Sequence, residues 1–191
     1  MNPGEKVDPL AVRSTAVSIA SDYPAAGSSF SYQQAAAVHD YVDRTISYVP
    51  DPRSRNYIAP PDETLETGAG DCDCQAVLVA SLLEAIGATT RLVVTEAPDG
   101  SRHMLPQVYL ADESDDTSTV ADSLETFYTE RGLDPNWYSF ETDRDGMVWY
   151  PADTAMGSYI GDLTGLSEKG YVDGPHDDGS WSWYDVEYYH Y

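Results

Sequence analysis

The chain has few basic residues. Its 191 residues include 10 Lys and Arg against 33 Asp and Glu, which gives a formal net charge of -23, and Lys6 and Lys169 are its only lysines. A field of this sign repels phosphate backbones and anionic lipid surfaces, so nucleic acid and membranes are disfavoured as partners. The expected partner is therefore a protein or peptide, as a substrate or within an assembly.

The charge imbalance also predicts the medium in which the chain folds. Repulsion among carboxylates weakens a compact state at low ionic strength, whereas molar salt shortens the screening length to about 3 Å. We therefore expect a halophilic protein. The alternatives are an acidic mesophilic protein and a disordered acidic chain, and the 41% hydrophobic and 12% aromatic content argues against disorder.

Long apolar runs are lacking as well. No stretch of about 18 apolar residues occurs, so no membrane-spanning helix is predicted. The first thirty residues also lack the basic start and apolar centre of a signal peptide. These features leave two compartments to consider, the cytoplasm of a halophile and a viral particle.

Cysteine is nearly absent. Cys72 and Cys74 are the only two, and with one residue between them a mutual disulfide would be strained. We expect at least one free thiol, and we expect Cys74 to be a packing residue. A Cys-x-Cys metal site completed by His103 lacks a clear fourth ligand, so the sequence predicts no metal and no other cofactor.

The chain is long enough for one domain with a hydrophobic core. Within residues 1–191 we expect an N-terminal helix at 8–22, a core at about 31–165 and an aromatic tail at 166–191. We expect this tail, which is rich in Trp and Tyr after residue 180, to pack over the sheet or over a cleft.

Apolar periodicity predicts several helices around a buried one. A helix at residues 31–47 has a single apolar face. Residues 48–70 have the proline and glycine content of a loop. From residue 72 to 86 the chain is apolar nearly all round, which is typical of a buried helix, and Gly87 lies where a left-handed helix cap belongs.

Strands are predicted after this helix, at residues 90–95, 104–110 and 147–150, with a short helix at 120–130. Pro106 predicts a sheet edge or a bulge in the second strand. The expected fold is α+β, with a buried helix packed on an antiparallel sheet.

Cys72 is the candidate nucleophile. The dipole and the unpaired amides at a helix N-terminus favour a thiolate there, whereas the neighbouring Asp71 and Asp73 oppose it. His103 begins a strand and is the leading partner among the four histidines. Asp153 follows a strand, where a carboxylate would orient that histidine.

The residues around Cys72 resemble a known family, the transglutaminase-like superfamily of papain-type folds. The segment 70–73, Gly-Asp-Cys-Asp, is followed by Ala76, Gly87 and Arg91 at positions +4, +15 and +19 from Cys72. This register is similar to the family's nucleophile motif when the nucleophile is Cys72, and it does not match at Cys74.

The other two motifs of the family are matched unequally. Residues 149–154, Trp-Tyr-Pro-Ala-Asp-Thr, resemble the segment that carries the family's aspartate. Residues 103–107 depart from the family's His-x-Trp-x-Glu strand at Leu105 and Gln107. The interval from His103 to Asp153 is also longer than usual, which predicts an inserted segment that carries an acidic surface loop at residues 112–118 and the helix near residue 120.

Two further segments are similar to archaeal and tailed-virus members of the family. They are residues 48–51, Tyr-Val-Pro-Asp, and residues 61–65, Pro-Asp-Glu-Thr-Leu. Members of that subgroup are often peptidases by prediction or components of particles.

The resemblance implies a cysteine peptidase, an amidase or a transglutaminase. Cys72 would attack an amide carbonyl, His103 would transfer the proton, Asp153 would hold the imidazole, and water or an amine would resolve the thioester. The alternative is a catalytically silent domain used as a structural or assembly module, for example in a viral particle, because a fold does not fix a function.

Overall fold

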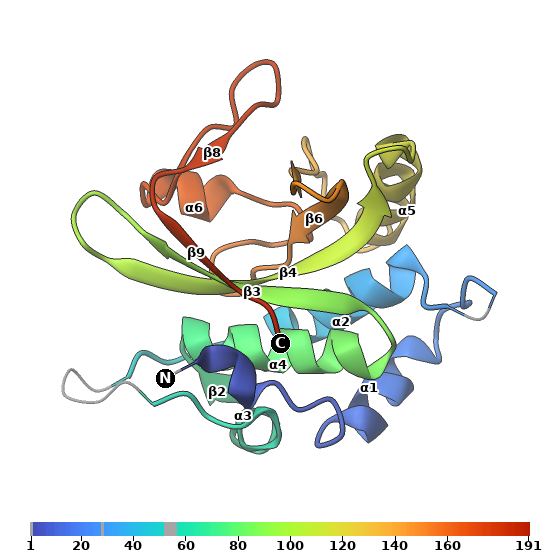
Figure 1. Ribbon diagram of the computed structural model, residues 1–191. Helices are drawn as coiled ribbons and strands as arrows, with labels where there is room; N and C mark the ends of the chain where they lie inside the picture. The colour runs from blue at the N-terminus through green and yellow to red at the C-terminus, as the bar shows by residue number, and fades with distance from the viewer. Residues whose placement is uncertain (1, 28, 52–56) are drawn as a thin grey trace.

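Helix α4 (Cys72–Ala85), apolar on almost every side, lies at the centre of the molecule. The computed structural model describes residues 2–27, 29–51 and 57–191. The helices of the first half of the chain form a layer against one face of a curved antiparallel sheet, and the later helices and the hairpin at residues 172–183 lie over the other face (Figure 1). The expected α+β fold with a buried helix on an antiparallel sheet is confirmed.

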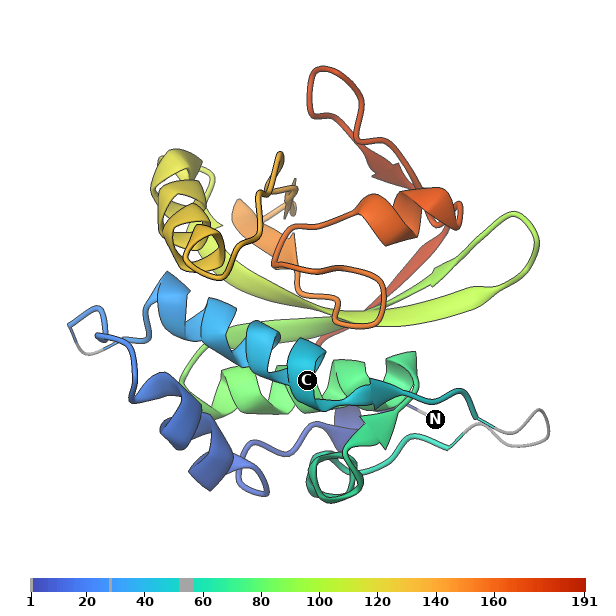
Figure 2. The same cartoon turned by 180° about the vertical axis from the view of Figure 1, so that it is seen from behind.

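The helical layer is assembled from the first half of the chain, as the reverse view shows (Figure 2). Ser31 and Gln34 form a reciprocal capping box that starts α2, which runs along α4. The elements of this layer besides α4 are the short 3-10 helix η1 (Pro3–Lys6), α1 (Arg13–Ala20), α2 (Tyr32–Thr45) and α3 (Pro61–Thr67).

The main sheet has five strands in the order β5-β6-β4-β3-β9, with neighbours antiparallel. The two long central strands form a hairpin, and the edge beside β3 is occupied by a strand from the C-terminal tail. The strands are β3 (Thr89–Glu96), β4 (Arg102–Asp112), β5 (Glu141–Thr142), β6 (Met147–Pro151) and β9 (Val186–Tyr189).

Smaller elements complete the chain. A parallel pair, β1 (Ser47–Tyr48) with β2 (Ala69–Gly70), joins the end of α2 to the start of α4. Helix α5 (Thr117–Thr129) packs on α2 and β4, while α6 (Thr164–Glu168) precedes the β7 (Val172–Asp173) and β8 (Ser182–Trp183) hairpin.

The core is continuous through α4. Leu78, Val79, Leu82 and Leu83 are fully buried in one apolar cluster with residues of α2, α5 and the sheet. Burial of each such side chain stabilises the fold by about 1.5–3 kcal/mol. Helix α4, which begins at Cys72, is therefore held in the core. No helix in the described residues is long and apolar enough to cross a membrane.

Three expectations from the sequence need correction. The N-terminal helix begins at Arg13 and not at residue 8, because the Asp8 carboxylate accepts hydrogen bonds from the Leu10 and Ala11 amides and holds a turn there. Residues 48–70 are not a plain loop, since β1, α3 and β2 lie among them; residues 52–56 of that segment lie outside the described part.

The third correction concerns Pro106, which is on neither an edge strand nor a bulge. It lies in β4, between β3 and β6. Its carbonyl accepts a hydrogen bond of 2.9 Å from the Ala152 amide, just beyond the end of β6. The hydrogen-bonded ladder between β4 and β6 ends at this position, so the absence of an N–H on Pro106 removes no ladder hydrogen bond. The register shift of β4 is further along the strand, between Tyr109 and Ala111.

Candidate active site

Cys72 is the first residue of α4. The Asp71 side chain caps the helix by accepting a hydrogen bond of 3.2 Å from the Cys74 amide. Glycine is needed at position 70, because a Cβ there would lie 2.6 Å from Cys74 Cβ. This close approach fixes the chain that leads into Cys72.

Cys74 points away from the site, as expected of a packing residue. Its Sγ accepts a hydrogen bond of 3.4 Å from the Ala59 amide, and burial raises the pKa of its thiol to about 12. The two cysteines are both free and occupy different environments, with Cys72 partly exposed and Cys74 buried. Cys74 is therefore protonated and enclosed at neutral pH.

His103 and Asp153, far apart in sequence, form a buried pair. Both side chains are about 2% exposed, and His103 Nε2 lies 2.7 Å from Asp153 Oδ2. The other carboxylate oxygen, Oδ1, accepts hydrogen bonds from the Ala155 and Met156 amides at 2.9 and 3.3 Å. The carboxylate is thus fixed by its own loop and presents one oxygen to the imidazole.

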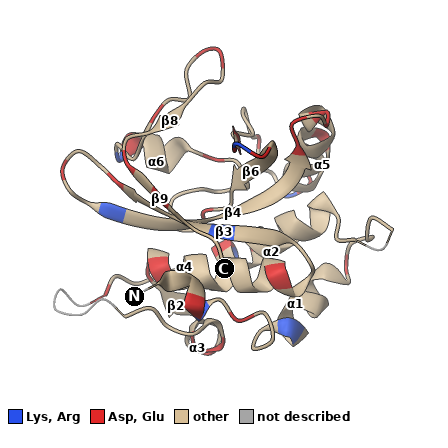
Figure 3. Cartoon of the chain, in the orientation of Figure 1, with Lys and Arg blue, Asp and Glu red and all other residues tan. Residues whose placement is uncertain are grey.

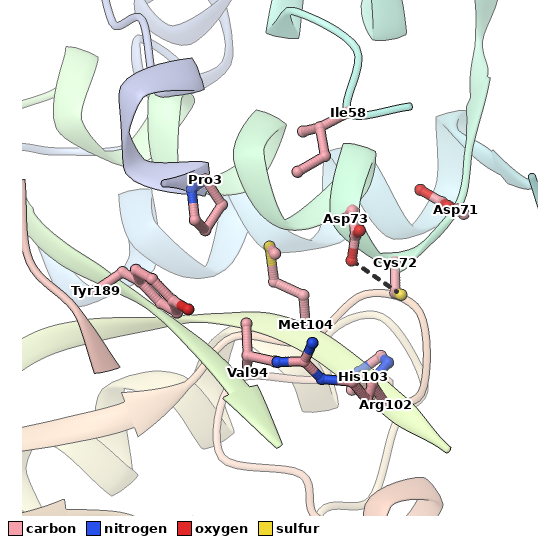
Figure 4. Close-up of a pocket in the computed structure, with 10 residues that line it drawn as sticks. All are labelled: Pro3, Ile58, Asp71, Cys72, Asp73, Val94, Arg102, His103, Met104 and Tyr189. Carbon is pink, nitrogen blue, oxygen red and sulfur yellow. Dashed lines mark hydrogen bonds between the residues drawn. The ribbon is translucent and has the colours of Figure 1, made fainter. Parts of the chain in front are cut away.

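The charge state of His103 follows from this contact. Burial alone would lower the pKa of the imidazole, but the Asp153 carboxylate, its hydrogen bond and the nearby Cys72 side chain together raise it to about 10. Cys72 Sγ also lies 3.4 Å from Asp73 Oδ1 (Figure 4). Because Nε2 faces Asp153, Nδ1 is the ring nitrogen left to serve the thiol.

A second buried histidine, His39, contacts the backbone of Asp153. It is fully buried on α2, and its Nε2 lies 3.0 Å from the backbone carbonyl of Asp153. Burial lowers the pKa of this imidazole, so the neutral ring donates Nε2–H to that carbonyl. His39 lies in the helix that the sequence predicts at residues 31–47, and no role was predicted for it. A histidine directly after the apolar run 35–38 was the available sign of its role.

Gln75 links the Cys72 and Asp153 segments. It lies one helical turn after Cys72, donates from Nε2 to the Gly70 carbonyl at 3.2 Å and accepts a 2.9 Å hydrogen bond from Thr154 Oγ1. Sequence reasoning missed this residue. A glutamine at the start of the long apolar run of this helix was the signal that could have found it.

The C-terminal segment covers His103. The Tyr171 ring packs against the imidazole at 5.4 Å between ring centroids, and its hydroxyl donates to Ser101 Oγ at 3.3 Å. The other histidines considered lie elsewhere: His176 is exposed beside Asp173, and His190 packs near Trp149. Only His103 among them is placed beside Cys72.

The two positions that depart from the family strand have structural roles here. Leu105 is fully buried in the core under α6. Gln107 is also buried and accepts a hydrogen bond of 2.7 Å from Arg91 Nε. Leu105 and Gln107 therefore pack and bond within the sheet, and the His103–Asp153 contact forms with both residues in place.

A cavity of about 560 Å³ opens beside Cys72. In Figure 4, Cys72 and His103 lie toward one end, Tyr189 and Pro3 toward the other, and Met104 lies between them. Among the described residues, no group of three or more His, Cys, Asp or Glu side chains is arranged to hold a metal ion. The chemistry available at the cavity is that of a thiol, an imidazole and a carboxylate.

Comparison with known families finds a match over the part of the chain that carries the candidate site. The family model described as "Transglutaminase-like superfamily" matches residues 19–153, which include Cys72, His103 and Asp153. A search of curated proteins finds no match.

Among solved structures, a Cytophaga hutchinsonii protein proposed to be a cysteine protease is 18% identical, with a TM-score of 0.45; the match covers 55% of this chain and 35% of that one. This chain thus spans about a third of the length of that protein. Legionella pneumophila LapG, in an EGTA-treated form, is 13% identical, with a TM-score of 0.47 and 90% of each chain covered.

Proposed function

The chain belongs to the transglutaminase-like superfamily, and from that premise we propose that it catalyses cysteine-dependent acyl transfer on peptide or side-chain amides. Cys72, His103 and Asp153 form the proposed catalytic triad. The observation that carries the proposal is the buried His103–Asp153 contact of 2.7 Å beside a cavity that also contains Cys72.

The proposed reaction has two half-reactions. The Cys72 sulfur forms a bond to the amide carbonyl carbon, and the carbon–nitrogen bond breaks as His103 gives its proton to the leaving amine. Water or a second amine then attacks the thioester, returns a proton through His103 and releases the Cys72 thiol. The backbone amide of Cys72, at the helix start, is the proposed donor to the oxyanion.

Asp153 has an indirect role in this scheme. A carboxylate that holds Nε2 fixes the ring so that Nδ1 faces the thiol, and it stabilises the imidazolium. His39 and Gln75 are proposed positioning residues, because their hydrogen bonds end on the Asp153 carbonyl and on the neighbouring Thr154 hydroxyl.

The alternative is a transglutaminase-like structural or assembly module without activity, because family membership alone does not establish catalysis. One property distinguishes the enzyme from the inactive module, namely whether the reactivity of the Cys72 thiol depends on His103. A buried histidine with a raised pKa next to a free cysteine favours the enzyme.

The test is the pH dependence of iodoacetamide alkylation, mapped to each cysteine by mass spectrometry in concentrated KCl. We expect Cys72 to react well below pH 7 and to lose that reactivity in the His103→Ala variant. Cys74 is the internal reference, since burial raises the pKa of its thiol to about 12. If Cys72 behaves as an ordinary thiol of pKa about 8.5 in both proteins, the silent module is correct.

We also propose that the protein works at high salt. The excess of acidic residues supports this, and Figure 3 shows Asp and Glu spread over several helices and loops with few Lys or Arg among them. An archaeal or tailed-virus origin remains a proposal that rests on the likeness of residues 48–51 and 61–65. The proposed partner is a protein or peptide.

A further inference from the structure

The cavity beside Cys72 has two chemically different ends. The reactive end carries Cys72 and His103 with the carboxylates of Asp71 and Asp73. The rest of the lining is largely apolar, with Pro3 and Tyr189 at the remote end, Met104 between the two ends, and Ile58 and Val94 along the walls; Arg102 is the charged residue of this part. A site divided in this way can hold a reacting carbonyl at one end and an apolar group at the other.

The apolar walls are part of the protein core. Ile58, Val94 and Met104 are each less than 10% exposed, and they pack with residues of α4 in a single apolar cluster. Such side chains have fixed rotamers because their neighbours surround them. The part of the cavity wall formed by these three residues is therefore rigid.

Both ends of the described chain close the remote side of the cavity. Tyr189 lies on β9, paired with Leu92 of β3, and Pro3 begins η1. The two segments are packed together, since a Cβ on Gly4 would lie 2.7 Å from the ring of Tyr191. The size of the apolar end therefore depends on the C-terminal strand.

The charges around the cavity disfavour an anionic group. Two cationic side chains line the cavity and both already face carboxylates: His103 is paired with Asp153, and the Arg102 guanidinium is within 3.8 Å of Glu96 and 3.6 Å of Glu187. Glu96 and Glu187 neutralise Arg102, while Asp71 and Asp73 add negative charge at the reactive end. An acidic side chain would lose its hydration and gain no free cation.

We propose that the apolar end is the subsite for a large apolar side chain of a peptide, on the residue whose carbonyl Cys72 attacks. This inference rests on the proposed function and specifies its substrate class. Ile58, Val94, Met104 and Tyr189 are the specificity-determining residues. Tyr189 sets the depth of the subsite because it closes the remote end.

The test uses N-acetyl dipeptide chloromethyl ketones with Leu, Ala or Glu as the reactive residue, and it follows the alkylation of Cys72 by intact mass. We expect the Leu probe to react at least about tenfold faster than the Ala probe, and the Glu probe to be slowest. In Tyr189→Ala the preference for Leu over Ala should fall to under about threefold. Tyr189→Trp, which fills the subsite, should shift the preference toward Ala.

Tyr184→Ala is the matched control, because Tyr184 lies in the same tail, is exposed and does not line the cavity. It should keep the preference of the natural sequence. Iodoacetamide has no side chain to place, so its rate measures the intrinsic reactivity of Cys72 in each protein, and each probe rate is divided by it.

Two results would overturn the inference in distinguishable ways. If iodoacetamide reactivity depends on His103 while the probes show no preference, or one that ignores Tyr189, the subsite is wrong and the proposed function stands. If Cys72 reactivity is independent of His103, the proposed function fails and the subsite fails with it.

Discussion

At the scale of single residues, the buried pair of His103 and Asp153 links the candidate site to the stability of the fold. The folded state raises the pKa of His103 from 6.5 to about 10, so folding favours the protonated imidazole. The stabilisation is fully present below pH 6.5 and is lost as the pH rises through about 10. Between these values, the free energy of unfolding should fall by up to about 1 kcal/mol per pH unit.

We expect this loss to appear as a fall in melting temperature between pH 7 and 9.5, measured at constant high salt. Asp153→Asn removes the carboxylate that raises the pKa of His103, so its melting temperature should depend less on pH over this interval. Asp162→Asn is the control: Asp162 is a buried carboxylate of the same loop whose partners are the Ser158 and Thr164 amides. A pH dependence unchanged by Asp153→Asn would contradict the assigned charge state.

The three residues selected from the sequence, Cys72, His103 and Asp153, lie close together, whereas the residues that contact the Asp153 loop were not predicted. Cys72 could be found because a helix start and a motif register are local patterns. His103 and Asp153 followed from their positions at strand ends and from the family resemblance. His39 and Gln75 were missed because each contacts a segment distant in sequence, the loop after β6, and a linear pattern does not specify such a contact.

At the scale of elements, the attachment of the C-terminal tail depends on a buried ion pair. The Arg91 guanidinium lies between the rings of Trp149 and Tyr188, 4.3 Å from each centroid, and forms an ion pair with Glu141. Glu141 also accepts hydrogen bonds from Trp183 Nε1 and the Tyr188 hydroxyl. This cluster joins β3, β5 and β6 to the tail strands β8 and β9.

We expect Glu141→Gln to lower the free energy of unfolding by about 2–4 kcal/mol, because it leaves the buried Arg91 charge without its closest anion. The measurement is urea unfolding at fixed salt. Glu96→Gln, which removes one partner of the exposed Arg102, is the control and should cost under about 1 kcal/mol. Equal losses in the two variants would show that the cluster does not hold the tail.

The sequence predicted the long elements better than the short ones. The buried helix and the two central strands were placed to within about two residues, since their apolar patterns are long. Helix α3 and the β1–β2 pair were missed because each has seven residues or fewer and is held by contacts with α4 and with its partner strand. The tail was expected to pack on the sheet or a cleft; β9 does so as an added strand.

At the scale of the whole molecule, the net charge sets the conditions under which these elements hold together. With 33 acidic and 10 basic residues, at least 33 - 10 = 23 carboxylates have no basic residue of their own to pair with. Their mutual repulsion is lower in an expanded chain, so it destabilises the folded state at low ionic strength. Salt screens exposed charges over about 10 Å at 0.1 M and about 3 Å at 1 M.

We therefore expect the melting temperature to rise steeply as KCl is raised to about 1 M, where the screening length falls below the usual spacing of surface charges, and to change less beyond it. Neutralising exposed carboxylates on α5 and at its C-cap, in the triple variant Asp122→Asn, Glu125→Gln, Glu130→Gln, should raise the melting temperature at low salt and reduce its dependence on KCl. Sucrose at matched water activity is the control, because it favours compact states without screening charge. If sucrose stabilises the protein as KCl does, or if the triple variant keeps the full salt dependence, then repulsion among carboxylates is not what limits the fold, and the excess of acidic residues needs a different explanation.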